Sequence, residues 1–331
     1  MSRYFLGVDI GGTKSHALIA DGEGRAVGFA RTGVGNPEVV GWEGLQEVLH
    51  ALVAEALLSA SLTPEQLVGA GFGVAGYDWP SDREPTRQAI ASLDLAAPWD
   101  FVNDTLLGLL AGARKGWGVA LVAGTGNNCR GRDPEGREGR VVGSGGRLGE
   151  YGGAGEIVAR AVQAVSRAWS LRAPPTRLTQ AFVDLTQTRD AAHLLESLMR
   201  GQCRLSAEAA RLVVAVALEG DAVAQGIIRW SGRELGSLAV GVIRQLELQP
   251  HAFDVVLMGS VFNVGPLLIE PLQETIRAEA PGAELVRLTA PPVVGAVLLG
   301  MEAAGRDPQP ARTRLFETLP QLLAVMEGEG A

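Results

Sequence analysis

The chain has 331 residues, 47% of them hydrophobic and 20% charged, and its formal net charge is −8 at pH 7. This length suggests two domains, and this composition is typical of a globular protein. The acidic balance, without a cluster of Lys and Arg, argues against a general nucleic-acid binder, and no apolar run approaches the roughly 18 residues of a membrane span.

The first residues and the cysteines bear on the cellular compartment. We expect no secretory signal peptide, because Arg3, Gly7 and Asp9 interrupt the apolar residues around them. The two cysteines, Cys129 and Cys203, are too few for a disulfide framework. A reducing cytoplasm is therefore the expected location.

The first predicted element is a buried strand that ends near Asp9 and turns at Gly11-Gly12. A turn without side chains lets main-chain N–H groups approach an anion, and Thr13, Lys14 and Ser15 would offer it hydroxyls and a cation. The stretch predicts half of a phosphate clamp. A glycine hairpin that only reverses the chain is the alternative.

The same pattern occurs a second time. At an offset of 112 residues, positions 12–25 and 124–137 share six identities over fourteen positions. Both copies run from an apolar strand through a Gly-Thr turn into a second turn that contains Asp. The repeat predicts two similar halves whose Gly-Thr turns hold a polyphosphate between them.

The first half alternates strands and helices, which is typical of a mixed α/β sheet covered on both faces. Asn36 lies in the loop before the first helix, where a turn residue is the plain interpretation. Strands are expected at 16–20, 25–31, 70–75 and 99–102, and helices at 38–60, from 81 or 82 to 92, and at 106–113.

Asp104 follows the strand at 99–102. Ligands bind at the carboxyl ends of strands in open α/β sheets, so Asp104 is a candidate catalytic carboxylate. An ordinary N-cap aspartate suits its position and residue type equally well. The two roles are compatible, because a capping carboxylate can also face a ligand.

The second half begins after a hinge at residues 112–116. A strand at 119–123 leads into Gly124-Thr125-Gly126, which can offer main-chain donors to phosphate. The amides of Asn127 and Asn128 follow and can bind a hydroxylated ligand.

A glycine-rich passage over residues 143–155 is predicted to wrap a ligand. It contains Gly145, Gly146 and Glu150, and a solvated loop carboxylate is the plain interpretation of Glu150. A helix is expected at 157–169. Residues 176–250 are predicted to be largely helical, and we expect them to support the fold and to form a subunit interface.

The last predicted elements are strands at 254–258 and 284–288 and helices at 266–279 and after Pro291-Pro292. Gly259-Ser260 stands at the tip of the first of these strands, with Asn263 shortly after it. Glycine at a strand tip lets a flat base or sugar lie against the backbone.

The order of these motifs resembles that of the actin, sugar kinase and Hsp70 ATPase superfamily. Within it, the run Gly124-Thr-Gly-Asn-Asn-Cys129 is similar to that of the BadF/BadG/BcrA/BcrD group, whose sugar-active members are N-acetylglucosamine kinases. The matching motifs are Asp9-Ile-Gly-Gly-Thr-Lys14, Asn103-Asp104, Val122-Ala-Gly-Thr-Gly-Asn127, Leu257-Met-Gly-Ser260 and the helix after Pro291-Pro292.

The resemblance implies two ribonuclease H-like (actin-like ATPase) domains, each with a mixed sheet, and an interdomain cleft. The expected domains are residues 1–114 and 115–331, the second with a helical insertion at about 157–250. It also implies a homodimer and an amino sugar as the partner, while the charge and hydropathy described above predict neither a nucleic-acid nor a membrane partner.

The implied activity is an ATP-dependent sugar kinase that phosphorylates a hydroxyl, the 6-OH, of N-acetylglucosamine. Asp104 would accept the hydroxyl proton, and Asp9 would organise Mg2+ through water. The residues expected to bind ATP are Gly11, Gly12, Thr13, Lys14, Gly124, Thr125, Gly126, Gly259, Ser260 and Asn263. Those expected to contact the sugar are Asn36, Asp104, Asn127, Asn128, Gly145, Gly146 and Glu150.

Two residues depart from the family pattern. Arg147 stands where many such kinases carry tryptophan, and Glu150 replaces an aspartate. The longer Glu150 would shift the hydroxyl that it grips. A cationic Arg147 would favour a sugar with a carboxylate, such as N-acetylmuramic acid, whereas a solvated loop arginine would have no such effect.

Two other functions stay open. An ATPase activator of a 2-hydroxyacyl-CoA dehydratase would hold an iron–sulfur cluster, against which the two cysteines argue. A non-catalytic sensor of ATP and sugar is the other, against which the intact Asp104 argues. The four histidines show no metal-ligand spacing, so the zinc site of ROK proteins is not expected.

Overall fold

The structure, a computed structural model, describes residues 3–328 of the 331. The chain folds into two compact units, of which the first runs to Gly118 and resumes at Val286, and the second is Val119–Leu285. Each unit contains one five-stranded sheet. The predicted α/β class with a mixed sheet in each half is confirmed.

The sheet of the first unit has the strand order β3-β2-β1-β4-β5. β2 pairs antiparallel with both β1 and β3, whereas β4 pairs parallel with β1 and β5. The strands are β1 Tyr4–Ile10, β2 Ser15–Asp21, β3 Ala26–Thr32, β4 Leu67–Val74 and β5 Trp99–Val102.

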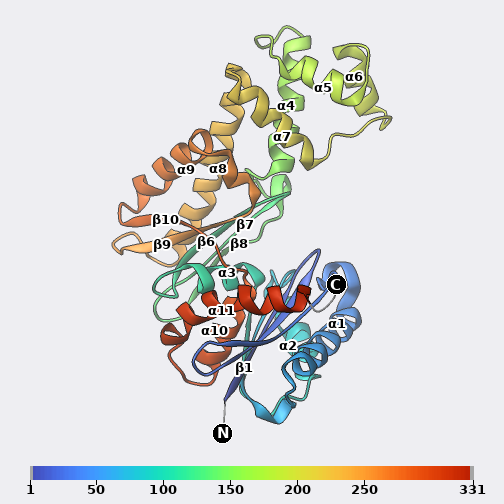
Figure 1. The fold of residues 1–331 in the computed structure, drawn as a ribbon. Coiled ribbons are helices and arrows are strands. Elements are labelled where there is room, and N and C mark those ends of the chain that lie inside the picture. The colour runs from blue at the N-terminus through green and yellow to red at the C-terminus, as the bar shows by residue number, and fades with distance from the viewer. Residues whose placement is uncertain (1–2, 329–331) are drawn as a thin grey trace. The chain divides into compact units, whose positions relative to one another are not determined.

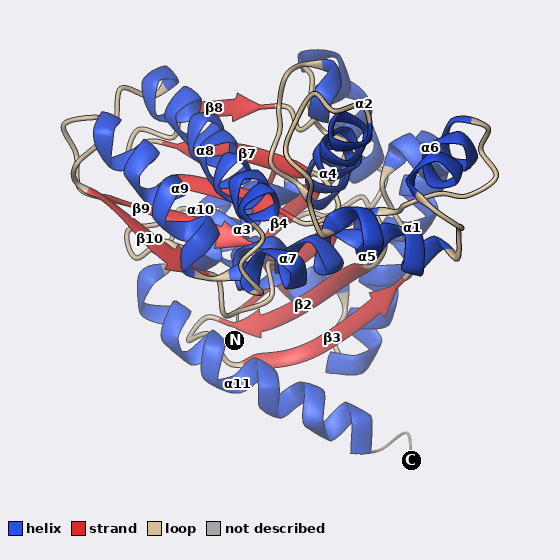
Figure 2. Cartoon of the chain, turned by 90° about the horizontal axis from the view of Figure 1, so that it is seen from above, coloured by secondary structure: helices blue, strands red, loops and turns tan. Residues whose placement is uncertain are grey.

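Two cores cover the two faces of this sheet. On one face Leu6, Val8 and Ile10 of β1 pack with the apolar stripe of α1, and on the other Phe5 packs with α10 and α11. Figure 1 shows α10 and α11 against the strands that open the chain, and Figure 2 shows α11 beside β3. The helices are α1 Pro37–Ala60, α2 Arg83–Ala91, α3 Asp104–Gly112, α10 Val293–Ala303 and α11 Gln309–Gly328.

Helix α10 approaches the sheet at backbone distance. A Cβ on Gly7 of β1 would lie 2.4 Å from the Val297 nitrogen, and one on Gly71 of β4 would lie 2.2 Å from the Ala296 carbonyl oxygen. The small residues of this helix and of the two strands are therefore needed for their packing. This close packing places residues 286–328 in the first unit, unlike the predicted domain of residues 115–331.

The sheet of the second unit repeats the plan of the first. Its order is β10-β9-β6-β7-β8, which corresponds strand for strand to β5-β4-β1-β2-β3. The strands are β6 Gly118–Ala123, β7 Asn127–Arg132, β8 Glu138–Val141, β9 Phe253–Met258 and β10 Ala283–Arg287.

Helices fill most of the second unit between β8 and β9, in agreement with the helical segment that the sequence predicts. α8 packs along α9 and against β7 and β8 (Figures 1 and 2). The helices are α4 Ala154–Trp169, α5 Leu178–Thr186, α6 Ala191–Met199, α7 Ala210–Leu218, α8 Ala222–Gln245 and α9 Pro266–Glu279.

The predicted internal repeat extends to individual hydrogen bonds. Asp21 Oδ1 accepts from the N–H groups of Glu23 and Arg25 at 3.0 and 2.9 Å. Asp133 Oδ1 accepts from the two equivalent groups at 3.0 and 2.7 Å. The repeated Asp residues therefore build the same turn in both units. No helix among the described residues is long and apolar enough to cross a membrane.

Candidate active site

The predicted ligand residues of the first unit lie along one edge of its sheet. β1, β4 and β5 run parallel, so their carboxyl ends share this edge. Asp9 pairs with Gly73, which pairs with Val102, and Asp104 follows that strand. The turn over residues 11–14 joins β1 to β2 at the same edge. The strand order thus brings the two aspartates and the glycine turn together.

Asp104 is the first residue of α3, which begins two residues before the predicted start. The N-cap is Asn103, whose side chain accepts from the Thr105 N–H at 3.0 Å and donates to the Tyr77 carbonyl at 3.2 Å. The N-cap interpretation of Asp104 is therefore wrong, because its neighbour takes that role. The half-buried Asp104 carboxylate accepts from the Thr105 N–H at 2.9 Å.

Asn36 caps α1. Its Oδ1 accepts from the Glu38 N–H at 2.8 Å. Gly76 packs closely against it, since a Cβ at that position would lie 2.4 Å from Asn36 Oδ1. The structural role explains the asparagine locally, and its contact with a sugar stays a prediction.

A serine hydroxyl accepts a hydrogen bond from the backbone of the glycine turn in the first unit. The Gly11 N–H donates to Ser15 Oγ at 3.3 Å, and a Cβ on Gly11 would lie 2.4 Å from the Lys14 carbonyl oxygen. Gly12, Thr13 and Lys14 are exposed, and a Cβ on Gly12 would meet no atom within 4 Å. The tip of the turn is therefore open to a ligand.

The corresponding turn of the second unit is tied to the start of α4. The N–H groups of Ala154 and Gly155 donate to the carbonyls of Gly124 and Thr125 at 2.9 and 3.0 Å. Thr125 is exposed, and a Cβ on Gly124 or Gly126 would meet no atom within 4 Å. This open turn beside a helix N-terminus is suited to an anion.

Gly259 lies beside this turn, at the end of β9. Its φ and ψ are 103° and 164°, and a Cβ would lie 2.2 Å from the Ala123 carbonyl oxygen of β6. Only glycine suits this backbone and this contact. The glycine that the sequence places at the strand tip is needed for β9 to turn away next to the phosphate turn.

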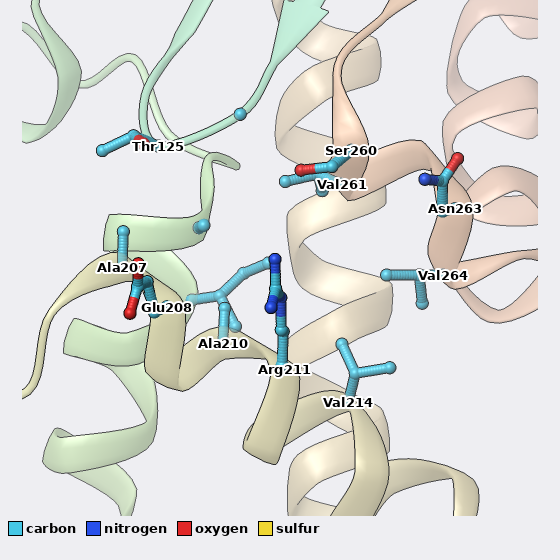
Figure 3. Close-up of a pocket in the computed structure, with 13 residues that line it drawn as sticks. Thr125, Ala207, Glu208, Ala210, Arg211, Val214, Ser260, Val261, Asn263 and Val264 are labelled. Carbon is cyan, nitrogen blue, oxygen red and sulfur yellow. The ribbon is translucent and has the colours of Figure 1, made fainter. Parts of the chain in front are cut away.

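A cavity of about 510 Å3 joins these elements within the second unit. Of the residues predicted to bind ATP, Gly124, Thr125, Ser260 and Asn263 line it. Figure 3 shows Arg211 reaching into it from α7, opposite the segment with Ser260 and Asn263. The lining combines hydroxyls, an amide and a cation with apolar side chains.

One wall of this cavity was not predicted from the sequence. That wall consists of Ala207, Glu208, Ala210, Arg211 and Val214, from α7 and the short turn before it. The segment was predicted to have only structural and interface roles. The spacing of its residues could have predicted this wall. Residues 207, 210, 211 and 214 have the spacing of one helix face, and they place small residues beside one cation.

In the second unit, hydrogen bonds join two of the predicted sugar residues, Asn127 and Glu150, to the glycine-rich loop. Asn127, which is 5% exposed, donates through Nδ2 to the Glu150 carbonyl at 3.1 Å. Glu150 is 8% exposed, and its carboxylate accepts from the N–H groups of Val142 and Ser144 at 3.2 and 2.6 Å. Glu150 is therefore not a solvated loop carboxylate, and these bonds use it to hold the loop that contains Gly145 and Gly146.

Both cysteines are free thiols. Cys129 is buried, and burial raises the pKa of its thiol, with the nearby Arg130 charge acting in the opposite direction. Among residues 3–328, no group of three or more His, Cys, Asp and Glu side chains is placed to hold a metal ion. One half-buried carboxylate, Asp9, stands by the first turn with His16 Nδ1 3.9 Å away.

This arrangement fits Mg2+ that is bound mainly by phosphate and water. Mg2+ keeps several waters and takes one or two protein carboxylates in phosphate sites. A dedicated protein cage is not needed for such an ion. The water-mediated role of Asp9 that the family resemblance implies is compatible with this arrangement and stays a prediction.

Comparison with known proteins places the chain among relatives that match almost throughout. The model of the BadF/BadG/BcrA/BcrD ATPase family matches residues 6–300. An N-acetylmuramic acid/N-acetylglucosamine kinase from Clostridium acetobutylicum is 25% identical over 299 residues, which cover 90% of this chain and 98% of that protein. An N-acetyl-D-glucosamine kinase from Dictyostelium discoideum is 26% identical over 314 residues, with the same coverage of 90% and 98%.

A solved structure agrees in fold. The crystal structure of a proposed N-acetylglucosamine kinase from Chromobacterium violaceum superposes with a TM-score of 0.62 at 24% identity. The match covers 90% of this chain and 98% of that one. The two repeated α/β units described above are thus those of the actin-like sugar kinase fold, as predicted.

Proposed function

Because the chain belongs to the BadF/BadG/BcrA/BcrD ATPase family, we propose that it is an ATP-dependent sugar kinase that transfers the γ-phosphoryl group to a hydroxyl of an amino sugar. The observation that supports this most is the cavity of about 510 Å3, in which the Gly124-Thr125 turn and the Ser260–Asn263 segment meet. Ligand pockets of about 300–1,000 Å3 are typical of small-molecule sites.

The nucleotide is bound in this proposal by the second unit. The turn with Thr125 and the N-terminus of α4 face its phosphates, and the backbone after Gly259 lies along its nucleoside. The open space at Gly124 and Gly126 supports this assignment, since no protein atom would contact a Cβ there. In the first unit, the exposed Thr13 and Lys14 offer a hydroxyl and a cation to an anion.

Asp104 is the proposed general base. It accepts the proton of the sugar hydroxyl, the 6-OH, as the oxygen attacks the γ-phosphorus. Such a base accelerates a reaction by about 10²–10⁴-fold. Asp9 would hold Mg2+ through water, and the ion would supply neutralisation of charge on the phosphates. The remaining work is positioning, which suits phosphoryl transfer.

N-acetylglucosamine is the proposed acceptor. The names of the two relatives, from Clostridium acetobutylicum and Dictyostelium discoideum, share this sugar. Arg147 is exposed, which is compatible with either a solvated side chain or one that meets the carboxylate of N-acetylmuramic acid. We propose a cytoplasmic homodimer as the working form.

The proposal is tested by ADP release from ATP and Mg2+ with N-acetylglucosamine, glucosamine, N-acetylmuramic acid, glucose or no sugar. The expected result is turnover with N-acetylglucosamine and none in the blank. Asp104→Asn should keep sugar binding, measured by calorimetry, and lose turnover by about 10²–10⁴-fold. Turnover without sugar, or none with any, would contradict the proposal, and unchanged turnover in Asp104→Asn would refute the base.

A further inference from the structure

The buried oxygen atoms near the Gly124 turn include three without a hydrogen-bond donor among the described residues. They are Asn127 Oδ1, Asn128 Oδ1 and Glu156 Oε2. A buried acceptor without a partner has lost its hydration without replacement, which is unfavourable, and more so when it is charged. Buried polar groups are nearly always satisfied, so an unsatisfied group points to a water, an ion or a ligand.

Glu156 is not among the residues that the sequence predicts to bind ATP or sugar. It lies in the first turn of α4, directly after the two residues that donate to the Gly124 and Thr125 carbonyls. Its two carboxylate oxygens lie 3.1 Å from the position of a Cβ on Gly145 and 2.8 Å from that of a Cβ on Gly153. The carboxylate is therefore held between the glycine loop and the start of α4.

The two asparagines lie in the same part of the unit. A Cβ on Gly143 would lie 2.6 Å from the Asn127 carbonyl oxygen and 3.3 Å from Asn128 Cβ. One on Gly153 would lie 2.9 Å from Gly126 Cα. The segments that carry the three oxygens thus meet at the glycine-rich loop of residues 143–155, next to the Gly124 turn that is proposed to bind phosphate.

Glu150 has a different role from Glu156. Both of its carboxylate oxygens accept hydrogen bonds from the backbone of its own loop. It is therefore less available to a ligand than the sequence suggests. Glu156 Oε2, with no donor among residues 3–328, has an unused capacity to accept.

We propose that Glu156 is a sugar-binding residue whose carboxylate accepts a hydrogen bond from an acceptor hydroxyl. The inference rests on the proposed sugar kinase function. Three buried acceptors without a donor are complemented by a ligand that donates, and a polyhydroxylated sugar with an acylamino N–H supplies hydroxyl and amide donors. A hydrogen bond from a hydroxyl to a carboxylate is charge-assisted and strong.

The experiment compares the full-length wild type with Glu156→Gln, which keeps the side-chain shape and removes the charge. N-acetylglucosamine binding is measured by calorimetry without nucleotide or divalent cation, and unfolding temperature is measured without sugar. The expected result is sugar affinity lower by about 10–100-fold, with an unfolding temperature equal to or above that of the wild type. Glu274→Gln, at an exposed site on α9, is the matched control and should change neither value.

The opposite combination would overturn the inference. Unchanged sugar affinity with a lower unfolding temperature in Glu156→Gln would show that the carboxylate is satisfied by water and serves stability. A wild-type affinity that requires added K+ or Mg2+, and loses that requirement in Glu156→Gln, would show an ion at this site instead. Failure of the wild type to bind any sugar would count against the proposed function itself.

Discussion

Replacing Gly259 with alanine should destabilise the second unit through the backbone. At φ 103° and ψ 164°, residue 259 occupies a region that is essentially restricted to glycine, and a non-glycine residue there costs about 1–3 kcal/mol. The new Cβ would also lie 2.2 Å from the Ala123 carbonyl oxygen. No flexible side chain can relieve this contact, so β6 or the turn after β9 must shift, at a further cost of about 1–3 kcal/mol.

The expected loss in the free energy of unfolding is therefore about 2–6 kcal/mol, a large part of the roughly 5–15 kcal/mol of a typical domain. Urea unfolding followed by circular dichroism measures it. ATP affinity, measured by calorimetry, should fall as well, because the displaced backbone lines the cavity.

Gly124→Ala is the matched control. A Cβ there meets no atom within 4 Å, so stability should change by no more than about 0.5 kcal/mol. ATP affinity should nevertheless fall, because the methyl group would occupy the space assigned to phosphate. Wild-type stability in Gly259→Ala would refute the backbone argument, and wild-type ATP affinity in Gly124→Ala would refute the assignment of that space.

Two further predictions concern the repeated turns and the cavity wall. Burial raises the pKa of Asp133, but hydrogen bonds from the Arg137 side chain and backbone lower it, and the net shift is downward. The ionised carboxylate therefore stabilises the folded chain above the unfolded pKa of about 4. This stability is lost as the pH falls through the lower pKa of the folded state. Asp133→Asn should lower the unfolding free energy by about 1–3 kcal/mol at pH 7 and should weaken the fall of that free energy below pH 4. Asp21→Asn, at the less buried site, should have a smaller effect. Equal effects of the two substitutions would contradict the burial argument. Arg211→Met should weaken ATP binding about tenfold, as expected for loss of a cation beside a base or phosphate, with stability changed by less than about 0.5 kcal/mol. Arg204→Met, exposed in the same unit, is its control, and equal loss in both would argue for a general charge effect.

Local patterns in the sequence predicted the elements and the repeat. Turn chemistry and hydrophobic periodicity act over a few residues, so the strand at 99–102 and the helix at 266–279 are observed at their predicted bounds. The six shared identities mark the turns of Asp21 and Asp133, whose hydrogen bonds proved equivalent. The residue types at the strand ends were enough to nominate Asp104 and the two glycine turns.

The tertiary structure decided what each polar side chain contacts and where distant segments pack. Residues 286–328 belong with the first unit because α10 packs at backbone distance on β1 and β4, and no local pattern encodes that contact. Arg211 lines the cavity because α7 packs beside the turn at Thr125. Glu150 and Glu156 look alike in sequence, but the fold satisfies one carboxylate with backbone donors and leaves an oxygen of the other without one among the described residues. The conformation of a loop decides whether its backbone donors reach a carboxylate, and therefore only the folded chain distinguishes the two.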